Sequence, residues 1–435
     1  MKTDLSAFWM PFTPNRLFRD APRMLARASG MYYQSDDGRQ ILDGTAGLWC
    51  VNAGHGRVEI RDAAARQLET MDFAPTFNMG HPLAFEVSAR LASHAPPGMD
   101  RVFLANSGSE AVDSALKIAL AYHQVRGETK RTLLVGRERG YHGVGFGGLS
   151  VGGIPKNREA WQSVLMPSAH IRHTLDLGRN AFSRGLPAHG AEFADDLERV
   201  IREHGAERIA AVIVEPIAGS TGVLLPPVGY LKRLREICTR HGLLLILDEV
   251  ITGFGRTGAW FAAERYGIKA DMITLAKGIT NGAIPMGAVL VQRELHDAFM
   301  QGARADIDLY HGYTYSGHPV ACAAALATFT IFEREQLPAR AASLAAHWES
   351  AAHALRGLPG VIDIRNDGLI AGFEFEAQPA RAPTRAYEVF RACFERGLLA
   401  RATGNILAFS PPLTISTAEI DQLFAILAEA IRATP

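Results

Sequence analysis

Cysteine is scarce and scattered in this sequence of 435 residues. Its four cysteines lie far apart, and no C-x-x-C pair occurs. This spacing argues against a zinc site and a dithiol redox motif, and it favours a reducing compartment. The histidines do not show the H-E-x-x-H spacing of a zinc-binding helix either. We therefore expect no metal and a cytoplasmic location.

A long hydrophobic run is also missing. The longest nearly apolar stretch, at residues 320–332, is shorter than the roughly 20 residues that span a bilayer. It is rich in alanine and predicts a buried helix. Residues 1–12 lack the apolar core of a signal peptide, so we expect neither secretion nor a membrane association.

The sequence has no excess of charge of either sign, because 45 Lys and Arg residues balance 45 Asp and Glu residues. This balance offers no global attraction to nucleic acid or to an anionic membrane, so we expect neither partner. An anionic ligand must instead be held by local groups. A hydrophobic content of 48% is ample for large buried cores, and the length predicts two or three structural units.

Short, continuous apolar runs alternate with helical patterns through the middle of the chain. Such runs are typical of strands that are buried on both faces. They occur at residues 101–105, 132–135, 209–214, 243–247 and 272–276. Between them, apolar stripes at 111–120 and 230–240 predict amphipathic helices. This alternation predicts an α/β fold with a mostly parallel sheet.

The pattern changes towards the C-terminus. From residue 384 onward, a helix, short strands at 397–409 and a final helix at 417–431 indicate a smaller α+β unit. We expect the segment before Gly54 to join this unit. The expected division is therefore a large domain over residues 55–320 and a small domain over residues 321–435, with residues 1–54 as an N-terminal segment that joins the small domain.

Three successive predicted strands end at ionisable residues, namely Glu215, Asp248 and Lys277. In an open parallel sheet, the binding site lies beyond the carboxyl ends of the strands. A single such residue is more often structural than catalytic, because strands usually give way to polar loops. A lysine and two carboxylates at successive strand ends instead favour a functional site.

The predicted strand at 101–105 is followed by Asn106, Ser107, Gly108, Ser109 and Glu110, and then by an amphipathic helix. Ser107 and Glu110 have the spacing of a capping box, which is an ordinary helix start. The same segment also offers free N–H groups, small hydroxyl residues and a glycine at the positive end of a helix dipole. It therefore also predicts a phosphate cradle.

Two segments, residues 143–148 and 253–258, match the dinucleotide-binding pattern G-x-G-x-x-G. Asp248 and Glu249 separate the second match from its strand, and Pro or polar residues follow the first. We interpret both as chance matches. The alternative that they would support is an NAD-dependent oxidoreductase. The pattern G-x-x-x-x-G-K-[ST] of a P-loop is absent.

Pyridoxal phosphate (PLP) matches the combination of a phosphate cradle, a strand-end aspartate and a strand-end lysine. Its phosphate suits a helix N-terminus, its aldehyde suits Lys277, and a carboxylate such as Asp248 keeps its pyridine nitrogen protonated. Lys277 must be neutral to react, and burial beside a cationic neighbour favours the neutral amine. One cofactor thus explains three separate features of the sequence.

Long motifs in the sequence resemble those of the class III aminotransferases of PLP fold type I. They are DEVITGFGRTG at 248–258, LAKG at 275–278 and GYTYSGHP at 312–319. The resemblance covers nearly the whole chain, and FWMPF at 8–12 with LDGTAGLW at 42–49 is most similar to the ω-amino acid:pyruvate (β-alanine:pyruvate) branch. It implies an aspartate-aminotransferase-like large domain with a mostly parallel seven-stranded sheet, and a smaller α+β domain. It also implies a homodimer with shared active sites, and it leaves open whether dimers pair into tetramers.

The resemblance also implies roles for the residues of the cofactor site. Lys277 is expected to bond to the cofactor and to move the substrate proton, and Asp248 to hold the pyridine nitrogen. Tyr141 and Val250 are expected on the two ring faces, with simple core packing as the alternative for each. Thr314 is expected to reach the phosphate from the neighbouring subunit. The full set of expected cofactor-binding residues is Ser107, Gly108, Ser109, Tyr141, His142, Glu215, Asp248, Val250, Lys277 and Thr314.

Trp49, Phe77, Tyr313 and Arg401 are the substrate-binding residues that the resemblance implies. Arg401 matches the carboxylate-binding arginine of the ω-transaminases, and an exposed structural arginine is the competing interpretation. A guanidinium group binds a carboxylate through two N–H groups, and a mobile one can swing away for an amine that has no carboxylate. Ala408 stands where some β-alanine enzymes have a polar residue, so the use of β-alanine stays open.

The sequence therefore predicts an ω-transaminase that moves an amino group from an ω-amino acid or a primary amine to pyruvate in two ping-pong half-reactions. The products are an aldehyde or ketone and alanine. Three alternatives stay open. They are a sister PLP activity such as that of an aminomutase, decarboxylase or racemase, an NAD-dependent oxidoreductase, and a protein that binds PLP without catalysis.

Overall fold

The largest sheet has seven strands in the order β4-β10-β9-β8-β7-β5-β6 in this computed structural model, which describes residues 4–378 and 383–434. In chain order its strands are β4 (Arg101–Ala105), β5 (Leu133–Arg137), β6 (Ser168–Ile171), β7 (Ile209–Val214), β8 (Leu244–Asp248), β9 (Met272–Leu275) and β10 (Gly287–Val291). β10 runs antiparallel to both of its neighbours, and the pairs from β9 to β6 are parallel. The predicted mostly parallel sheet is confirmed.

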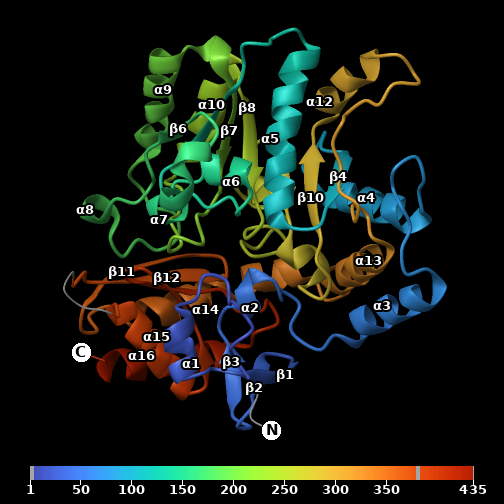
Figure 1. The fold of residues 1–435 in the computed structure, drawn as a ribbon. Coiled ribbons are helices and arrows are strands. Elements are labelled where there is room, and N and C mark those ends of the chain that lie inside the picture. Colours follow the sequence, from blue (N-terminus) through green and yellow to red (C-terminus); the bar gives the residue numbers. More distant parts are fainter. Residues whose placement is uncertain (1–3, 379–382, 435) are drawn as a thin grey trace.

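Helices cover both faces of this sheet, which explains why its strands are continuously apolar. In β7, Ala211 and Ile213 pack with residues of α5 (Gly108–Val125). Val212 and Val214 point to the opposite face and belong to the core to which α10 (Tyr230–His241) also contributes. Figure 1 shows the sheet between these two helices in the upper part of the view. The buried strands give the site at their ends a rigid base.

Two smaller sheets lie beyond the carboxyl ends of the central strands (Figure 1). Their orders are β1-β2-β3-β13 and β11-β12-β15-β14. Their strands are β1 (Leu25–Ser29), β2 (Tyr32–Ser35), β3 (Gln40–Asp43), β11 (Val361–Asp367), β12 (Ile370–Phe375), β13 (Leu398–Leu399), β14 (Arg401–Thr403) and β15 (Ile406–Phe409). β3 and β13 pair in parallel, with Leu42 opposite Leu398, so the N-terminal segment shares a sheet with a C-terminal strand.

An aromatic core joins the smaller sheets to α14 (Leu337–His353), α15 (Arg385–Glu395) and α16 (Thr417–Arg432). The rings of Trp348 in α14 and Phe424 in α16 have centroids 4.8 Å apart, and Phe373 of β12 lies 5.8 Å from the same phenylalanine. α16 begins at a capping box, which satisfies the free N–H groups of its first turn. The predicted final helix is confirmed.

α13 (Pro319–Arg334) is buried over most of its length, as the alanine-rich stretch at 320–332 predicts. It packs against α3 (Val58–Thr70), α4 (Pro82–His94) and the 3₁₀ turn η4 (Lys277–Thr280). No helix in the described ranges is both long enough and apolar enough to cross a membrane. The remaining helices and turns are α1 (Asn15–Asp20), α2 (Ala46–Trp49), α6 (Phe146–Val151), α7 (Pro155–Arg158), η1 (Glu159–Val164), α8 (Leu177–Asn180), η2 (Ala191–Asp195), α9 (Asp196–His204), η3 (Ala206–Arg208), α11 (Ala262–Tyr266), α12 (Arg293–Asp297) and η5 (Ala298–Gln301).

Candidate active site

A cavity of about 490 Å³ opens at the carboxyl ends of β7, β8 and β9. Glu215 directly follows β7, Asp248 ends β8, and Lys277 begins η4 after β9. Because the three strands are parallel and adjacent, these side chains border one cavity. The expected site residues that line it are Trp49, Gly108, Ser109, Tyr141, His142, Glu215, Asp248, Val250, Lys277 and Arg401.

Lys277 lines the cavity with its backbone in the left-handed region, at a φ of 52°. This conformation costs a residue with a Cβ about 1–2 kcal/mol, and it persists only where the surroundings fix it. In the part of the chain that the structure describes, the ε-amine has no hydrogen-bond or ion-pair partner. Burial lowers the pKa of this amine below its usual value, Cys50, Asp248 and Glu215 oppose the shift, and the charge of Arg401 adds to it. The surroundings thus favour a neutral, nucleophilic amine.

Protein groups engage both carboxylate oxygens of Asp248. Oδ2 lies 2.8 Å from Nδ1 of His142. Oδ1 accepts the hydroxyl of Thr274 at 3.0 Å and the backbone N–H of Val250 at 3.2 Å. Nε2 of His142 is buried and has no hydrogen-bond partner among the described residues. These contacts fix the orientation of a carboxylate in the cavity wall.

The N-terminus of α5 faces the cavity. Ser107 Oγ accepts the N–H of Glu110 at 3.2 Å, so this serine caps the helix. In a full capping box the Glu110 carboxylate would accept the N–H of Ser107. Here it accepts the N–H of Asn106 instead, at 2.8 Å. The first N–H groups of a helix have no intrahelical acceptor, and here they belong to Gly108 and Ser109, which line the cavity. This arrangement can bind an anion such as a phosphate.

Gly143 packs against the start of α5 and lies in the first of the two glycine-rich matches. Its φ is +86°, and a Cβ at this position would lie 2.7 Å from Cα of Ser109, so only glycine fits. Ser109 Oγ also accepts the N–H of Val144 at 3.1 Å. The segment thus holds Ser109 at the cavity. No residue of the second match, at 253–258, lines this cavity.

Glu215 is a buried carboxyl group beside Tyr141. Its Oε1 accepts the backbone N–H of Tyr141 at 2.9 Å. Burial raises the pKa of Glu215 to about 7, with His142 opposing the shift and Asp248 adding to it. Glu215 therefore orients Tyr141 and can hold a proton near neutral pH.

Arg401 and Trp49 form another part of the cavity wall. Arg401 begins β14, where it pairs with Ala408 of β15. Burial lowers the pKa of this guanidinium group. Its Nε has no hydrogen-bond partner, and no acidic side chain pairs with it in the described ranges. Trp49 is only 2% exposed and packs against Ile251. A half-buried cation without an acidic partner is available to an anionic substrate.

Several cavity residues have no assigned role in the sequence prediction. They are Pro11, Phe12, Thr13, Leu48, Val112, Gly143, Ile154, Asn157, Ser220, Ile251, Ala276 and Thr403. Pro11 and Phe12 belong to the FWMPF motif, so a signal for them was present in the resemblance. Ile154 and Asn157 belong to none of the motifs. The path of the chain at α7 brings them to the cavity, and no local pattern indicates this path.

Phe77, Tyr313 and Thr314 do not line this cavity. Phe77 is 59% exposed and borders a separate hollow together with Gly312. The hydroxyl of Tyr313 donates to the Glu110 carbonyl of α5 at 3.3 Å, and Thr314 is exposed. Thr314 is expected to act in a second subunit. Phe77 and Tyr313 are expected beside Trp49, but a single chain does not bring them there.

Comparisons with known proteins identify the family. The model of the family "Aminotransferase class-III" matches residues 17–431. The ω-aminotransferase of Caulobacter vibrioides is 58% identical over 420 residues, which are 97% of this chain and 96% of the relative. The β-alanine–pyruvate aminotransferase of Pseudomonas aeruginosa is 45% identical over 431 residues, 98% of this chain and 96% of the relative. The crystal structure of an amine transaminase from an uncultivated Pseudomonas species, in a PLP-bound form, matches with a TM-score of 0.91 and 36% identity over 99% of both chains.

The chain therefore belongs to the class III aminotransferases. Enzymes of this family depend on PLP. The residues of the cavity fit this cofactor. The N–H groups at the start of α5 suit its phosphate, the Asp248 carboxylate suits its pyridine nitrogen, and the unpartnered amine of Lys277 suits its aldehyde.

Proposed function

We propose that this chain is an ω-transaminase that transfers the amino group of an ω-amino acid or a primary amine to pyruvate. The products are an aldehyde or ketone and alanine. One observation carries the proposal: the unpartnered amine of Lys277 and the unpaired guanidinium of Arg401 line the same cavity. The first group suits amine chemistry on PLP, and the second suits a carboxylate substrate. The four cysteines are unpaired, which suits a reducing compartment such as the cytoplasm.

When bound, PLP supplies an electron sink that makes the proton on the amine-bearing carbon acidic. Gly108 and Ser109 would hold its phosphate through their backbone N–H groups. Asp248 would hold its pyridine nitrogen, because this carboxylate is fixed in the cavity wall by His142. Tyr141 and Val250 line the remaining space and would contact the ring.

Lys277 would act as the base of the reaction. Its amine lines the cavity and has no protein partner among the described residues, so it is free to take the proton from the substrate carbon and to return it. Its lowered pKa favours the neutral form that this step requires. Glu215 would support the site by holding the backbone of Tyr141.

Arg401 would bind the carboxylate of pyruvate or of an ω-amino acid through its planar N–H groups. An amine without a carboxylate would instead contact the apolar atoms of Leu48, Trp49 and Ile251, which line the same cavity. The wall therefore has a polar part and an apolar part. This combination explains how one site can accept both kinds of amine donor and pyruvate.

We further propose that the working enzyme is a homodimer in which each chain completes the site of the other. Large apolar side chains are exposed around the hollow that Phe77 borders, and this hollow has a volume of about 580 Å³. Phe77, Met79 and Phe85 line the hollow, and Phe73, Tyr310 and Tyr315 are exposed close to its lining residues in the sequence. A second copy of the chain would bury this surface. The site around Lys277 of the second copy would then receive Phe77, Tyr313 and Thr314 of the first.

The first half-reaction tests the proposed activity. With an amine donor and no pyruvate, the purified enzyme should lose its visible absorption once and release one equivalent of aldehyde or ketone per site. Added pyruvate should restore the absorption and yield one equivalent of alanine. Lys277→Ala should do neither and should keep the far-ultraviolet circular dichroism of the wild type. Normal turnover by Lys277→Ala would overturn the assignment of this lysine.

The same assay separates the alternatives. Release of carbon dioxide, racemisation or migration of the amino group would indicate a sister activity on the same fold. Binding of NAD without a visible absorption band would indicate an oxidoreductase. A visible band without any turnover would indicate a protein that binds PLP and does not catalyse.

A mixing experiment tests the shared site. Lys277→Ala should be inactive, and Thr314→Asp should be inactive because its carboxylate would repel the phosphate. In a mixed dimer, one site combines the intact Lys277 of one chain with the intact Thr314 of the other. Mixing after reversible dissociation should therefore restore up to about half of the wild-type activity per mixed dimer. An inactive mixture that contains mixed dimers would contradict the shared site.

A further inference from the structure

We propose that Asn281 is a positioning residue for Lys277, because it ties the turn that carries this lysine to residues 49–54, here called the wall segment. The wall segment begins at Trp49, which lines the cavity. This inference deepens the proposed function and rests on the role that Lys277 has there. Asn281 itself does not line the cavity, so its effect must be transmitted through the backbone.

Asn281 directly follows the 3₁₀ turn η4, which begins at Lys277, and caps its C-terminal end. Its φ of 53° lies in the left-handed region, which asparagine adopts more readily than most residues with a Cβ. Its N–H donates to the carbonyl of Gly278 at 3.1 Å, and the N–H of Gly282 donates to the carbonyl of Lys277 at 3.2 Å. Left-handed backbone at both Lys277 and Asn281 thus encloses one tight turn.

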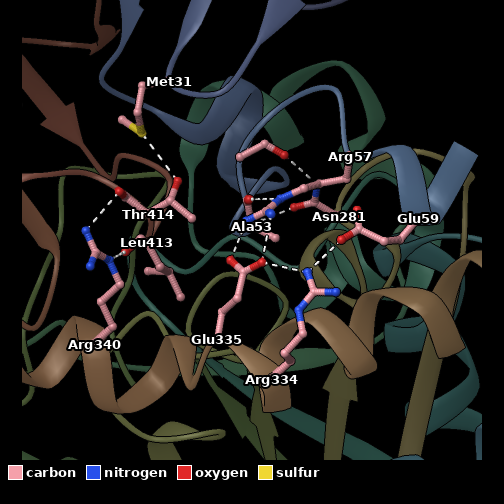
Figure 2. A network of polar contacts seen from close by, with 11 residues as sticks. Met31, Ala53, Arg57, Glu59, Asn281, Arg334, Glu335, Arg340, Leu413 and Thr414 are labelled. Atoms are coloured by element: carbon pink, nitrogen blue, oxygen red, sulfur yellow. Dashed lines mark hydrogen bonds and ion pairs between the residues drawn. The ribbon is translucent and has the colours of Figure 1, made fainter.

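The side chain of Asn281 is 6% exposed and uses both of its polar ends. Oδ1 accepts the N–H of Ala53 at 2.7 Å, and Nδ2 donates to the carbonyl of Gly54 at 2.9 Å. Figure 2 shows Asn281 facing Ala53 across this contact. The turn also packs on the wall segment at Gly282, where a Cβ would lie 2.9 Å from Cβ of Cys50. The turn and the wall segment are therefore in direct contact.

An ion-pair network also holds the wall segment (Figure 2). Arg57 Nε donates to the carbonyl of Ala53 at 2.6 Å, and its two terminal nitrogens bind both carboxylate oxygens of Glu335, at 2.8 and 2.6 Å. Arg334 joins Glu335 to Glu59 through contacts of 2.9 and 2.6 Å. Glu335 follows the last residue of the buried helix α13, so this network anchors the wall segment to the core.

Amine transfer needs Nζ of Lys277 and the wall at Trp49 in one fixed geometry, because a displacement of about 1 Å can reduce the rate about 100-fold. The left-handed backbone at Lys277 persists only where neighbouring groups fix it. Asn281 supplies both a tolerated left-handed backbone and two hydrogen bonds to the wall segment. Glycine would supply only the backbone conformation, and alanine would supply neither.

Three variants of this residue separate the two contributions. Asn281→Gly keeps the backbone conformation and loses both side-chain hydrogen bonds, and Asn281→Ala loses both contributions. Asn281→Asp keeps the acceptor for Ala53 and loses the donor to Gly54. Asn180→Gly is the matched control. The Asn180 side chain also bonds backbone through both polar ends, because Nδ2 donates to the carbonyl of His189 at 2.7 Å and Oδ1 accepts the N–H of the same histidine at 3.3 Å, and Asn180 does not line the cavity.

We expect Asn281→Gly and Asn281→Ala to lower the single-turnover rate of the first half-reaction by about 10- to 100-fold at saturating amine, with the KM changed by less than about threefold. Asn281→Asp should lose at least as much as Asn281→Gly, because its second carboxylate oxygen would face the carbonyl of Gly54 with no proton to donate. Asn180→Gly should keep the wild-type rate even if its melting temperature falls as far. A wild-type rate for Asn281→Gly, or an equal loss for Asn180→Gly, would overturn the inference.

Hydrogen exchange of the cofactor-free protein gives a second readout that does not depend on activity. In the wild type, the N–H groups of Ala53 and Gly282 should exchange slowly. In Asn281→Gly both should exchange at least tenfold faster, and α16 should be unchanged. Fast exchange of both groups in the wild type would overturn the inference even if no variant folds. Failure of the proposed function is distinguishable, because it would appear as normal turnover by Lys277→Ala.

Discussion

Replacement of Arg401 by alanine should separate substrates by whether they carry a carboxylate. Arg401 is half-buried and lines the cavity, its Nε has no protein partner, and no acidic side chain neutralises it among the described residues. A hydrogen bond to a charged partner contributes about 1.5–3 kcal/mol. Because 1.36 kcal/mol corresponds to a factor of ten, loss of the interaction should lower kcat/KM for pyruvate about 10- to 150-fold.

The assay compares two half-reactions of the same variant. The rate with a neutral arylalkylamine should stay within about threefold of the wild type, because such an amine has no group for Arg401 to bind. The rate with pyruvate or an ω-amino acid should fall by the full factor. Arg61→Ala removes an exposed arginine that pairs with Asp62, so it controls for the change in total charge. An equal loss with neutral and carboxylate substrates would refute the carboxylate role of Arg401.

Three further changes test other parts of the structure. Burial raises the pKa of Glu215 from 4.5 to about 7, so the folded protein binds this proton more tightly than the unfolded chain does. The tighter binding adds stability that is fully present below about pH 4.5 and is lost as the pH rises through 7. Glu215→Gln should therefore remove a pH dependence of about 3 kcal/mol from the unfolding free energy of the cofactor-free protein, and an unchanged slope in urea melts would contradict this. Gly143→Ala should weaken cofactor binding, because its Cβ would clash with Ser109. Gly127→Ala should not weaken it, because Gly127 also has a positive φ but faces open space, and equilibrium dialysis compares the two variants. Trp348→Ala should lower the unfolding free energy by about 3–5 kcal/mol in denaturant melts, since this side chain is fully buried, and a loss below about 1 kcal/mol would show that its core can refill.

The central strands could be predicted where they are buried on both faces. The apolar run at 209–214 coincides with β7, whose residues are all buried. β6 was missed because it lies at the edge of the sheet and contains Ser168 and His170 in place of a continuous apolar run. β10 is as apolar as β7, but it is antiparallel and not part of a repeated strand–helix unit, so its place between β4 and β9 had no signal.

The part of the candidate site that lies at the strand ends of the central sheet could be predicted from the sequence. Glu215, Asp248 and Lys277 stand at successive strand ends, so their proximity follows from parallel topology. Trp49 and Arg401 come from segments more than three hundred residues apart in the chain, and only the resemblance pointed to them. Their meeting depends on how the smaller sheets pack against the strand ends, which no local pattern encodes.

Two features could not be predicted from the sequence of one chain. In the proposed homodimer, Phe77 would reach the Lys277 of a second copy of the chain, so no pattern within one chain can place it. The contact of Asn281 with Ala53 and Gly54 uses backbone atoms of the wall segment, whose positions depend on the path of the chain and not on side-chain type.

Reduction of the purified enzyme with borohydride, followed by digestion and mass spectrometry, tests the central claim most directly. The account predicts a pyridoxyl phosphate group on the peptide that contains Lys277, and none on the corresponding peptide of Lys277→Ala. An unmodified Lys277 in the wild-type enzyme, or a stoichiometric label on another lysine such as Lys269, would contradict it.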